Sequence, residues 1–211
     1  MAASSLENIL LFSSGNDIFA LDDREKEPIK IVSRKSKIYA LCFYNEKLYG
    51  GGTDGKIFEI LTGEEIASRD YPILAICIHN GKLHDGGHYG VVETLTGKVI
   101  SRRSVTALCS HNDILYGGEF GEIFEILTEK VVAWRGGNWV YTLYSCNGNL
   151  YDGGDNCKVF ETLARKEVAS RNNSIYTLYS HNGILHDGGL YDKIFETLTG
   201  KVVASRYRSI F

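Results

Sequence analysis

The stretch HNGILHDGGLYDKIFETLTGKVVASR, residues 181–206, decides the fold because the chain repeats it with variations. Residues 79–102 read HNGKLHDGGHYGVVETLTGKVISR, and residues 45–69 read NEKLYGGGTDGKIFEILTGEEIASR. Five copies align on the leucine before the glycine pair, at separations of 35, 32, 35 and 35 residues: Leu48, Leu83, Leu115, Leu150 and Leu185. Internal periods of this length are typical of solenoids, arrays and propellers.

Each copy contains four short segments with strand character, for example IYTLYSHN, ILHDGG, KIFETL and KVVASR in residues 175–206. Asn-Gly joins the first two segments in three copies, and this pair favours a type I′ hairpin turn, which needs φ > 0 at both central residues. No part of the unit shows ten residues of helical period. We therefore predict that every unit is a four-stranded antiparallel meander.

The two ends of the chain supply a sixth unit. Residues 9–21 (ILLFSSGNDIFAL) match segments two and three, residues 29–34 (IKIVSR) match segment four, and the C-terminal SRYRSIF stops inside another first segment. We predict an all-β fold with a single domain over residues 1–211, a six-bladed β-propeller of four-stranded antiparallel blades. Pairing of the N- and C-terminal segments in one blade would close the ring, which avoids long free edges. A parallel β-helix and a tandem sandwich are the less favoured alternatives.

The composition bounds the function classes. The formal net charge of -3 at pH 7 gives no overall attraction to nucleic acid or to an acidic membrane. The N-terminal MAASSLENILLFSSG lacks the pattern of a secretory signal, and no window has the roughly 20 apolar residues of a membrane span. The five cysteines show no CxxC pair and fit small buried residues. We expect a cytoplasmic, monomeric protein that binds no nucleic acid or membrane.

The repeat resembles that of quinoprotein-like (PQQ-like) β-propellers and, more distantly, of WD40 propellers. The resemblance rests on LYGGGTDGKIFEILTGEEIAS in residues 48–68 and on GNDIFAL in residues 15–21: a strand that ends in small residues, a turn, an aromatic strand and a Thr-Gly turn. It implies a propeller fold and leaves the activity open. The tryptophan expected after the Thr-Gly turn is absent from most units, as are the Gly-His and Trp-Asp signatures of WD40 blades. Because we find no adjacent cysteine pair and no metal constellation, we expect no quinone and no other cofactor.

An arginine ends the fourth segment of all six units, which makes it the most regular polar feature of the sequence. The six form a candidate ligand-binding set: Arg34, Arg69, Arg102, Arg135, Arg171 and Arg206. In a propeller, these positions share one face, near the links that lead from outer to inner strands. Guanidinium groups suit carboxylate or phosphate because they are planar, charged and rich in donors.

A structural role for these arginines is the alternative. Segment three carries a glutamate in five units, and the motif before the glycines carries an aspartate in three, so each arginine has candidate acidic partners: Glu59, Glu93, Glu125, Glu161, Glu196, Asp85, Asp152 and Asp187. Whether they meet depends on strand register at the Thr-Gly turn, which the sequence leaves open.

The remaining candidates lie where the chain departs from the repeat. Gly136, Gly137, Asn138 and Trp139 form an unusual link, and Trp139 beside Arg135 is a candidate recognition residue, since tryptophan and arginine are common in interaction hot spots. A tryptophan wedged between blades is the alternative. The histidines lie in different units, so we expect no metal site, and many of the 13 tyrosines are candidates for filling the space between blades.

We find no pattern for catalysis and expect no enzyme. The hypothesis is a non-enzymatic binding scaffold that takes a protein or peptide partner on the arginine-bearing face. One alternative is a sensor or enzyme that holds a small anion, a phosphate or carboxylate, at the channel mouth. Another is a glycan-binding lectin. The similarity of the units also fits an engineered repeat protein.

Overall fold

The computed structural model describes residues 9–22, 28–189 and 193–205, and these residues form 22 β-strands and no helix. Within each sheet, every strand pairs antiparallel with its neighbour in the sequence, as a meander requires. The all-β expectation is therefore confirmed for the described residues.

Five hydrogen-bonded sheets follow one another along the chain. The first has three strands: β1 (Ile9–Ser14), β2 (Asp17–Asp22) and β3 (Ile29–Ser33). The next two have four strands each: β4 (Ile38–Tyr44), β5 (Lys47–Gly52), β6 (Lys56–Glu59) and β7 (Glu65–Ser68), then β8 (Ala75–His79), β9 (Lys82–Gly87), β10 (Gly90–Glu93) and β11 (Lys98–Ser101).

A seven-stranded sheet comes next, and a further four-stranded sheet ends the described chain. The larger sheet contains β12 (Ala107–His111), β13 (Ile114–Gly118), β14 (Phe120–Glu125), β15 (Val131–Cys146), β16 (Asn149–Gly154), β17 (Lys158–Glu161) and β18 (Lys166–Ser170). The last contains β19 (Ile175–His181), β20 (Ile184–Gly189), β21 (Lys193–Glu196) and β22 (Val202–Ser205).

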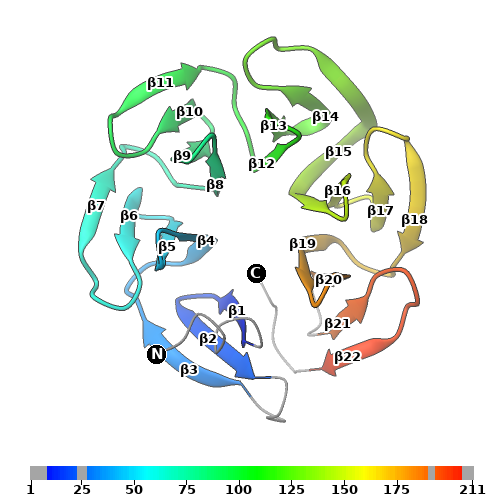
Figure 1. Cartoon of the computed structure of the whole chain (residues 1–211), viewed down its shortest axis with the longest axis horizontal. Coiled ribbons are helices and arrows are strands. Elements are labelled where there is room, and N and C mark those ends of the chain that lie inside the picture. The colour runs from blue at the N-terminus through cyan, green and yellow to red at the C-terminus, as the bar shows by residue number, and fades with distance from the viewer. Residues whose placement is uncertain (1–8, 23–27, 190–192, 206–211) are drawn as a thin grey trace.

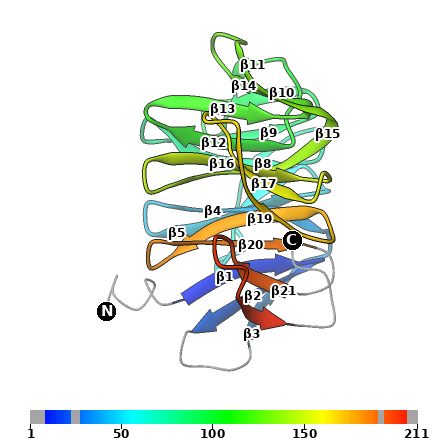
Figure 2. The same ribbon diagram turned by 90° about the vertical axis from the view of Figure 1, so that its right-hand side faces the viewer.

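The sheets stand around a common axis like the blades of a propeller (Figure 1). β4, β8, β12 and β19 lie nearest the axis, while β7, β11, β18 and β22 lie on the outside. Seen from the side, the inner strands cross the thickness of the ring (Figure 2). We call the end where the chain passes from an outer to an inner strand the link face, and the end with the Asn hairpins the turn face. The predicted propeller is confirmed.

The asparagine hairpins form as the sequence predicts. Asn45, Asn80, Asn112, Asn147 and Asn182 have φ between 47° and 50°, and the residue after each also has positive φ, as type I′ turns require. The first and second strands of successive units therefore pair in the same register, and equivalent side chains take equivalent positions in each unit.

The glycine pairs allow neighbouring blades to approach closely. A Cβ added to Gly51 would lie 2.7 Å from Ile73, and one added to Gly153 would lie 2.7 Å from Ile175. In both cases the apolar residue begins the inner-strand segment of the next unit. Both isoleucines are buried, at 0% and 2% exposed. Glycine therefore admits the aliphatic side chain that seals the space between blades.

The prediction of six four-stranded blades is wrong. Among the described residues, four sheets have four or more strands, one of them with seven, and a fifth has three. The 16-residue β15 causes one departure: Gly136 and Gly137, with φ of 65° and 79°, let the link continue as strand, so two repeat units share one sheet. The C-terminal segment expected to close the ring lies outside the described residues. None of the described residues forms a helix that could cross a membrane.

Candidate binding face

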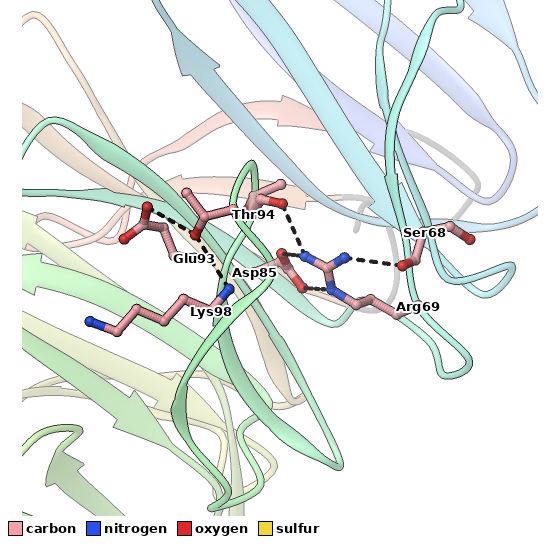
Figure 3. A network of polar contacts seen from close by, with 7 residues as sticks. Ser68, Arg69, Asp85, Glu93, Thr94 and Lys98 are labelled. Atoms are coloured by element: carbon pink, nitrogen blue, oxygen red, sulfur yellow. Dashed lines mark hydrogen bonds and ion pairs between the residues drawn. The ribbon is translucent and has the colours of Figure 1, made fainter.

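The arginines near the link face reach into the neighbouring unit. Arg69, after the outer strand β7, donates from Nε and Nη2 to the two carboxylate oxygens of Asp85 on β9, at 3.0 and 2.7 Å (Figure 3). It also donates from Nη2 to the carbonyl of Thr94 at 3.2 Å and from Nη1 to that of Ser68 at 3.0 Å. The planar fork of donors is therefore matched to acceptors within the protein.

Two further units repeat this arrangement. Arg135 holds Asp152 through bonds of 2.7 Å from both Nε and Nη2, and Arg171 holds Asp187 at 2.8 and 2.6 Å. The arginine side chains are 6% and 13% exposed, and the aspartates at most 1%. Asp152 also accepts a 2.7 Å hydrogen bond from Thr162. These pairs link the end of one unit to the second strand of the next.

The electrostatics of these pairs balance two opposing effects. Burial raises the pKa of the Asp85 carboxyl above its ordinary value, while the hydrogen bonds and charge of Arg69 lower it. Burial dominates, because removing a carboxylate from water is costly even beside a guanidinium. The arginine therefore compensates a buried acid that would otherwise be strongly destabilising.

Four of the arginines near the link face lie over an aromatic ring, most closely where the unit has glycine in place of the aspartate. The Arg34 guanidinium lies 3.7 Å from the centre of the Phe58 ring, and that of Arg103 lies 3.5 Å from the centre of Phe124. Arg103 also pairs with Glu122. Arg102, the predicted member of the set, is exposed, and its neighbour Arg103 occupies the equivalent contact. Two arginines follow one another here, so the sequence did indicate that either could make the contact, but the sequence analysis considered only Arg102.

The predicted arginines thus divide into separate environments. Arg69, Arg135 and Arg171 are paired with aspartate, Arg34 lies over a phenylalanine, Arg102 is exposed, and Arg206 lies outside the described residues. Of the acidic residues that the sequence offered as alternative partners for the arginines, the aspartates are the ones that pair with them. The glutamates Glu59 and Glu93 instead bind Lys47 and Lys82 of their own units. Ligand binding by the arginines stays a prediction.

A cavity of about 560 Å³ follows the axis of the ring. Residues of β1 and of the inner segments of the five other units line it, including Cys42, Cys77 and Cys109 at equivalent positions. These thiols are free, and burial raises the pKa of each, for Cys42 and Cys109 to about 12. They are therefore protonated at neutral pH, as expected for structural rather than reactive cysteines.

A second hollow, of about 300 Å³, opens where this cavity reaches the link face. It shares most of its lining with the cavity, and we call it the aromatic mouth, formed by Tyr39, Leu74, His88, Thr106, Trp139, Tyr141 and Tyr176. Tyr141 and Tyr176 stack with ring centres 4.8 Å apart. Such a volume and such a lining are typical of sites that bind small groups.

The long strand β15 places Trp139 in the mouth. It pairs with Phe120 on β14, and the two rings meet edge to face with centres 5.2 Å apart. Gly136 and Gly137 extend the strand so that Trp139 lies between its outer and inner parts. Arg135, proposed as its functional neighbour, is buried on Asp152 instead. Trp139 is partly buried, and Phe120 is 52% exposed.

Two histidines connect neighbouring units near the turn face. The Nδ1 atoms of His79 and His111 lie 2.9 Å from the hydroxyls of Ser110 and Ser145, each in the next unit. Burial lowers the pKa of both histidines below the ordinary value of 6.5. No group of three or more metal-ligating side chains occurs within residues 9–22, 28–189 and 193–205. Sequence reasoning missed this bonding because it depends on the register between units.

Comparisons with known proteins agree on the fold. No family model and no curated protein matches the chain. Among solved structures, the chain is similar to the WD40 β-propeller domain of Doa1, with a TM-score of 0.66 and 11% identity over 97% of this chain and 78% of that one. It is also similar to the computationally designed Ika8 protein, with a TM-score of 0.55 and 20% identity over 96% of this chain and 73% of that one. At these identities the likeness shows the propeller fold and nothing more.

Proposed function

We propose that the protein is a non-enzymatic binding scaffold that takes a protein or peptide partner on its link face. The aromatic mouth carries this proposal, since it gathers four aromatic side chains, Tyr39, Trp139, Tyr141 and Tyr176, at one concave site. Tyrosine and tryptophan offer large contact areas at a small cost in conformational entropy, and they are enriched at binding hot spots. We further propose that the protein is a cytoplasmic monomer, and that the quinoprotein-like repeat reflects a shared way of building blades.

The arginine pairs support a partner platform more than an anion sensor. Three of the guanidinium groups are neutralised by buried aspartates, so a phosphate or carboxylate would have to displace a bidentate partner. The lectin alternative would need equivalent pockets in several units. The mouth differs from this, because its rings come from different units and converge on one place.

Peptide selection tests the proposal. A random twelve-residue peptide library is panned against the immobilised protein, and enriched peptides are titrated by calorimetry. We expect peptides that bind the wild-type protein and lose about tenfold or more in affinity in Tyr39→Ala, because truncating an aromatic anchor typically removes at least 1–2 kcal/mol.

The matched control is Leu127→Ser, which removes a 72% exposed leucine from the Thr-containing turn of its unit, at the opposite end of the ring. Affinity in this variant should equal that of the wild type. Failure to enrich any peptide, or peptides that lose affinity in Leu127→Ser and keep it in Tyr39→Ala, would contradict a partner site on the link face.

A further inference from the structure

The aromatic mouth has a chemical preference that its rings and one carboxylate determine. Four aromatic side chains line it, from the starts of inner segments that lie around the axis. Tyr39 is 40% exposed, and Trp139 and Tyr141 are partly buried, so the protein does not fully enclose these three rings. The face of an aromatic ring carries partial negative charge and attracts cations, with tryptophan the strongest and tyrosine next.

Asp155 supplies a negative charge behind these rings. Its backbone N–H donates to the carbonyl of Trp139 at 3.2 Å, which fixes it beside the strand that carries Trp139 and Tyr141. Among the described residues, its Oδ1 atom is buried and has no hydrogen-bond partner. A buried carboxylate oxygen without a partner is costly, and such a group in a native structure requires an explanation.

Asp155 holds the repeat position that corresponds to a residue of the mouth. Asp155 directly follows the glycine pair of its unit, and His88, which follows the glycine pair of another unit, lines the mouth. The field of Asp155 is felt at the Tyr141 hydroxyl, because burial and then the Asp155 charge raise the pKa of Tyr141. Position and charge therefore agree: the charge of the Asp155 carboxylate acts on a ring that lines the hollow.

We propose that the aromatic mouth binds an alkylated ammonium group, such as a methylated lysine side chain of the partner, with the aromatic rings around the cation and Asp155 as its counter-charge. An alkylated ammonium fits better than a free one, since its methyl groups make apolar contacts with the rings and it is less strongly hydrated. The hollow of about 300 Å³ has ample room for it. This inference rests on the proposed partner site and adds the chemistry of the group that is recognised.

Choline and its neutral isostere, 3,3-dimethylbutan-1-ol, test the proposal because they differ in charge and share their shape. Binding is followed by tryptophan fluorescence in a Trp134→Phe background, where Trp139 is the only indole that remains. Choline should bind about tenfold tighter than the alcohol, as expected for a desolvated cation on aromatic faces. Equal affinities, or tighter binding of the alcohol, would overturn the proposal.

Two variants separate the rings from the carboxylate. Asp155→Asn keeps the shape and should weaken choline about fivefold while leaving the alcohol unchanged, since only a charge is removed. Tyr176→Leu should weaken choline similarly, and Tyr176→Phe should retain most of the affinity because it keeps the ring face. Thermal unfolding of each variant confirms that it is folded. Unchanged choline binding in both Asp155→Asn and Tyr176→Leu would also overturn the proposal.

The outcome for peptides distinguishes this inference from the function on which it rests. If peptides select the link face but choline shows no advantage over its isostere, the partner site stands and the cation preference falls. If choline binds as expected while no peptide is enriched, the mouth is a cation site without a peptide partner. A failure of both contradicts both proposals.

Discussion

At the scale of single residues, buried ion pairs join neighbouring units near the link face. Arg135 and Asp152 are both almost fully buried, so removing one leaves the other unpaired away from water. We expect Arg135→Ala to lower the free energy of unfolding by about 3–5 kcal/mol, the usual cost of breaking such a pair. Urea unfolding of the variant and the wild type measures this loss of free energy.

Arg34→Ala is the matched control for this prediction. Arg34 ends the same repeat segment but rests on the Phe58 ring, and it makes no ion pair with a carboxylate of the described residues. Its truncation should cost about 1 kcal/mol. Equal losses in Arg34→Ala and Arg135→Ala would mean that the aspartate pairs contribute no more than the ring contacts.

At the scale of strands, the units come in two matched versions. Units with aspartate before the glycines have threonine after the glutamate of segment three, as in Asp152 and Thr162, which share a 2.7 Å hydrogen bond. Units with glycine have isoleucine instead, as in Gly50 and Ile60, where an added Cβ would lie 2.7 Å from Cδ1 of the isoleucine. The isoleucine fills the space that the carboxylate otherwise occupies.

This matching predicts coupled substitutions on β16 and just after β17. Asp152→Gly alone leaves Arg135 and Thr162 without their partner, and Thr162→Ile alone crowds a buried carboxylate with a methyl group. The double variant recreates the Gly50 and Ile60 version, with Arg135 already 4.2 Å from the centre of the Phe160 ring. We expect it to be at least about 1 kcal/mol more stable than the sum of the single effects predicts. Additive effects in a double-mutant cycle of unfolding free energies would contradict the matching.

How far the sequence predicts these elements depends on whether the information is local. The Asn-Gly turns and the alternating strands follow from local propensity, so the meanders and the propeller were predictable. β15 was not, because positive φ at Gly136 and Gly137 is compatible with either a turn or a continued strand. The Arg69 and Asp85 contact was left open for a related reason, since it depends on the register between units, which a one-residue slip would change.

At the scale of the whole molecule, buried histidines around the ring make stability depend on pH. Burial is the main cause that lowers the pKa of His79, His84, His111 and His186 below the ordinary value of 6.5. The unfolded chain therefore binds protons more readily than the folded protein as the pH falls through 6.5. The raised pKa of Asp85 acts in the opposite direction at lower pH, because there the folded state binds the proton more readily.

We therefore expect the urea midpoint to be highest above pH 7 and to fall between about pH 6.5 and 5. For each histidine, every unit by which folding lowers the pKa reduces the free energy of unfolding by about 1.4 kcal/mol once titration is complete. Replacing His84 and His186 by glutamine should flatten this dependence, while His79 and His111, each beside a serine hydroxyl of the next unit, retain part of it. A midpoint that stays constant from pH 7.5 to 5, or a slope that the two substitutions leave unchanged, would mean that the histidine rings take up protons in the folded state as easily as in the unfolded chain.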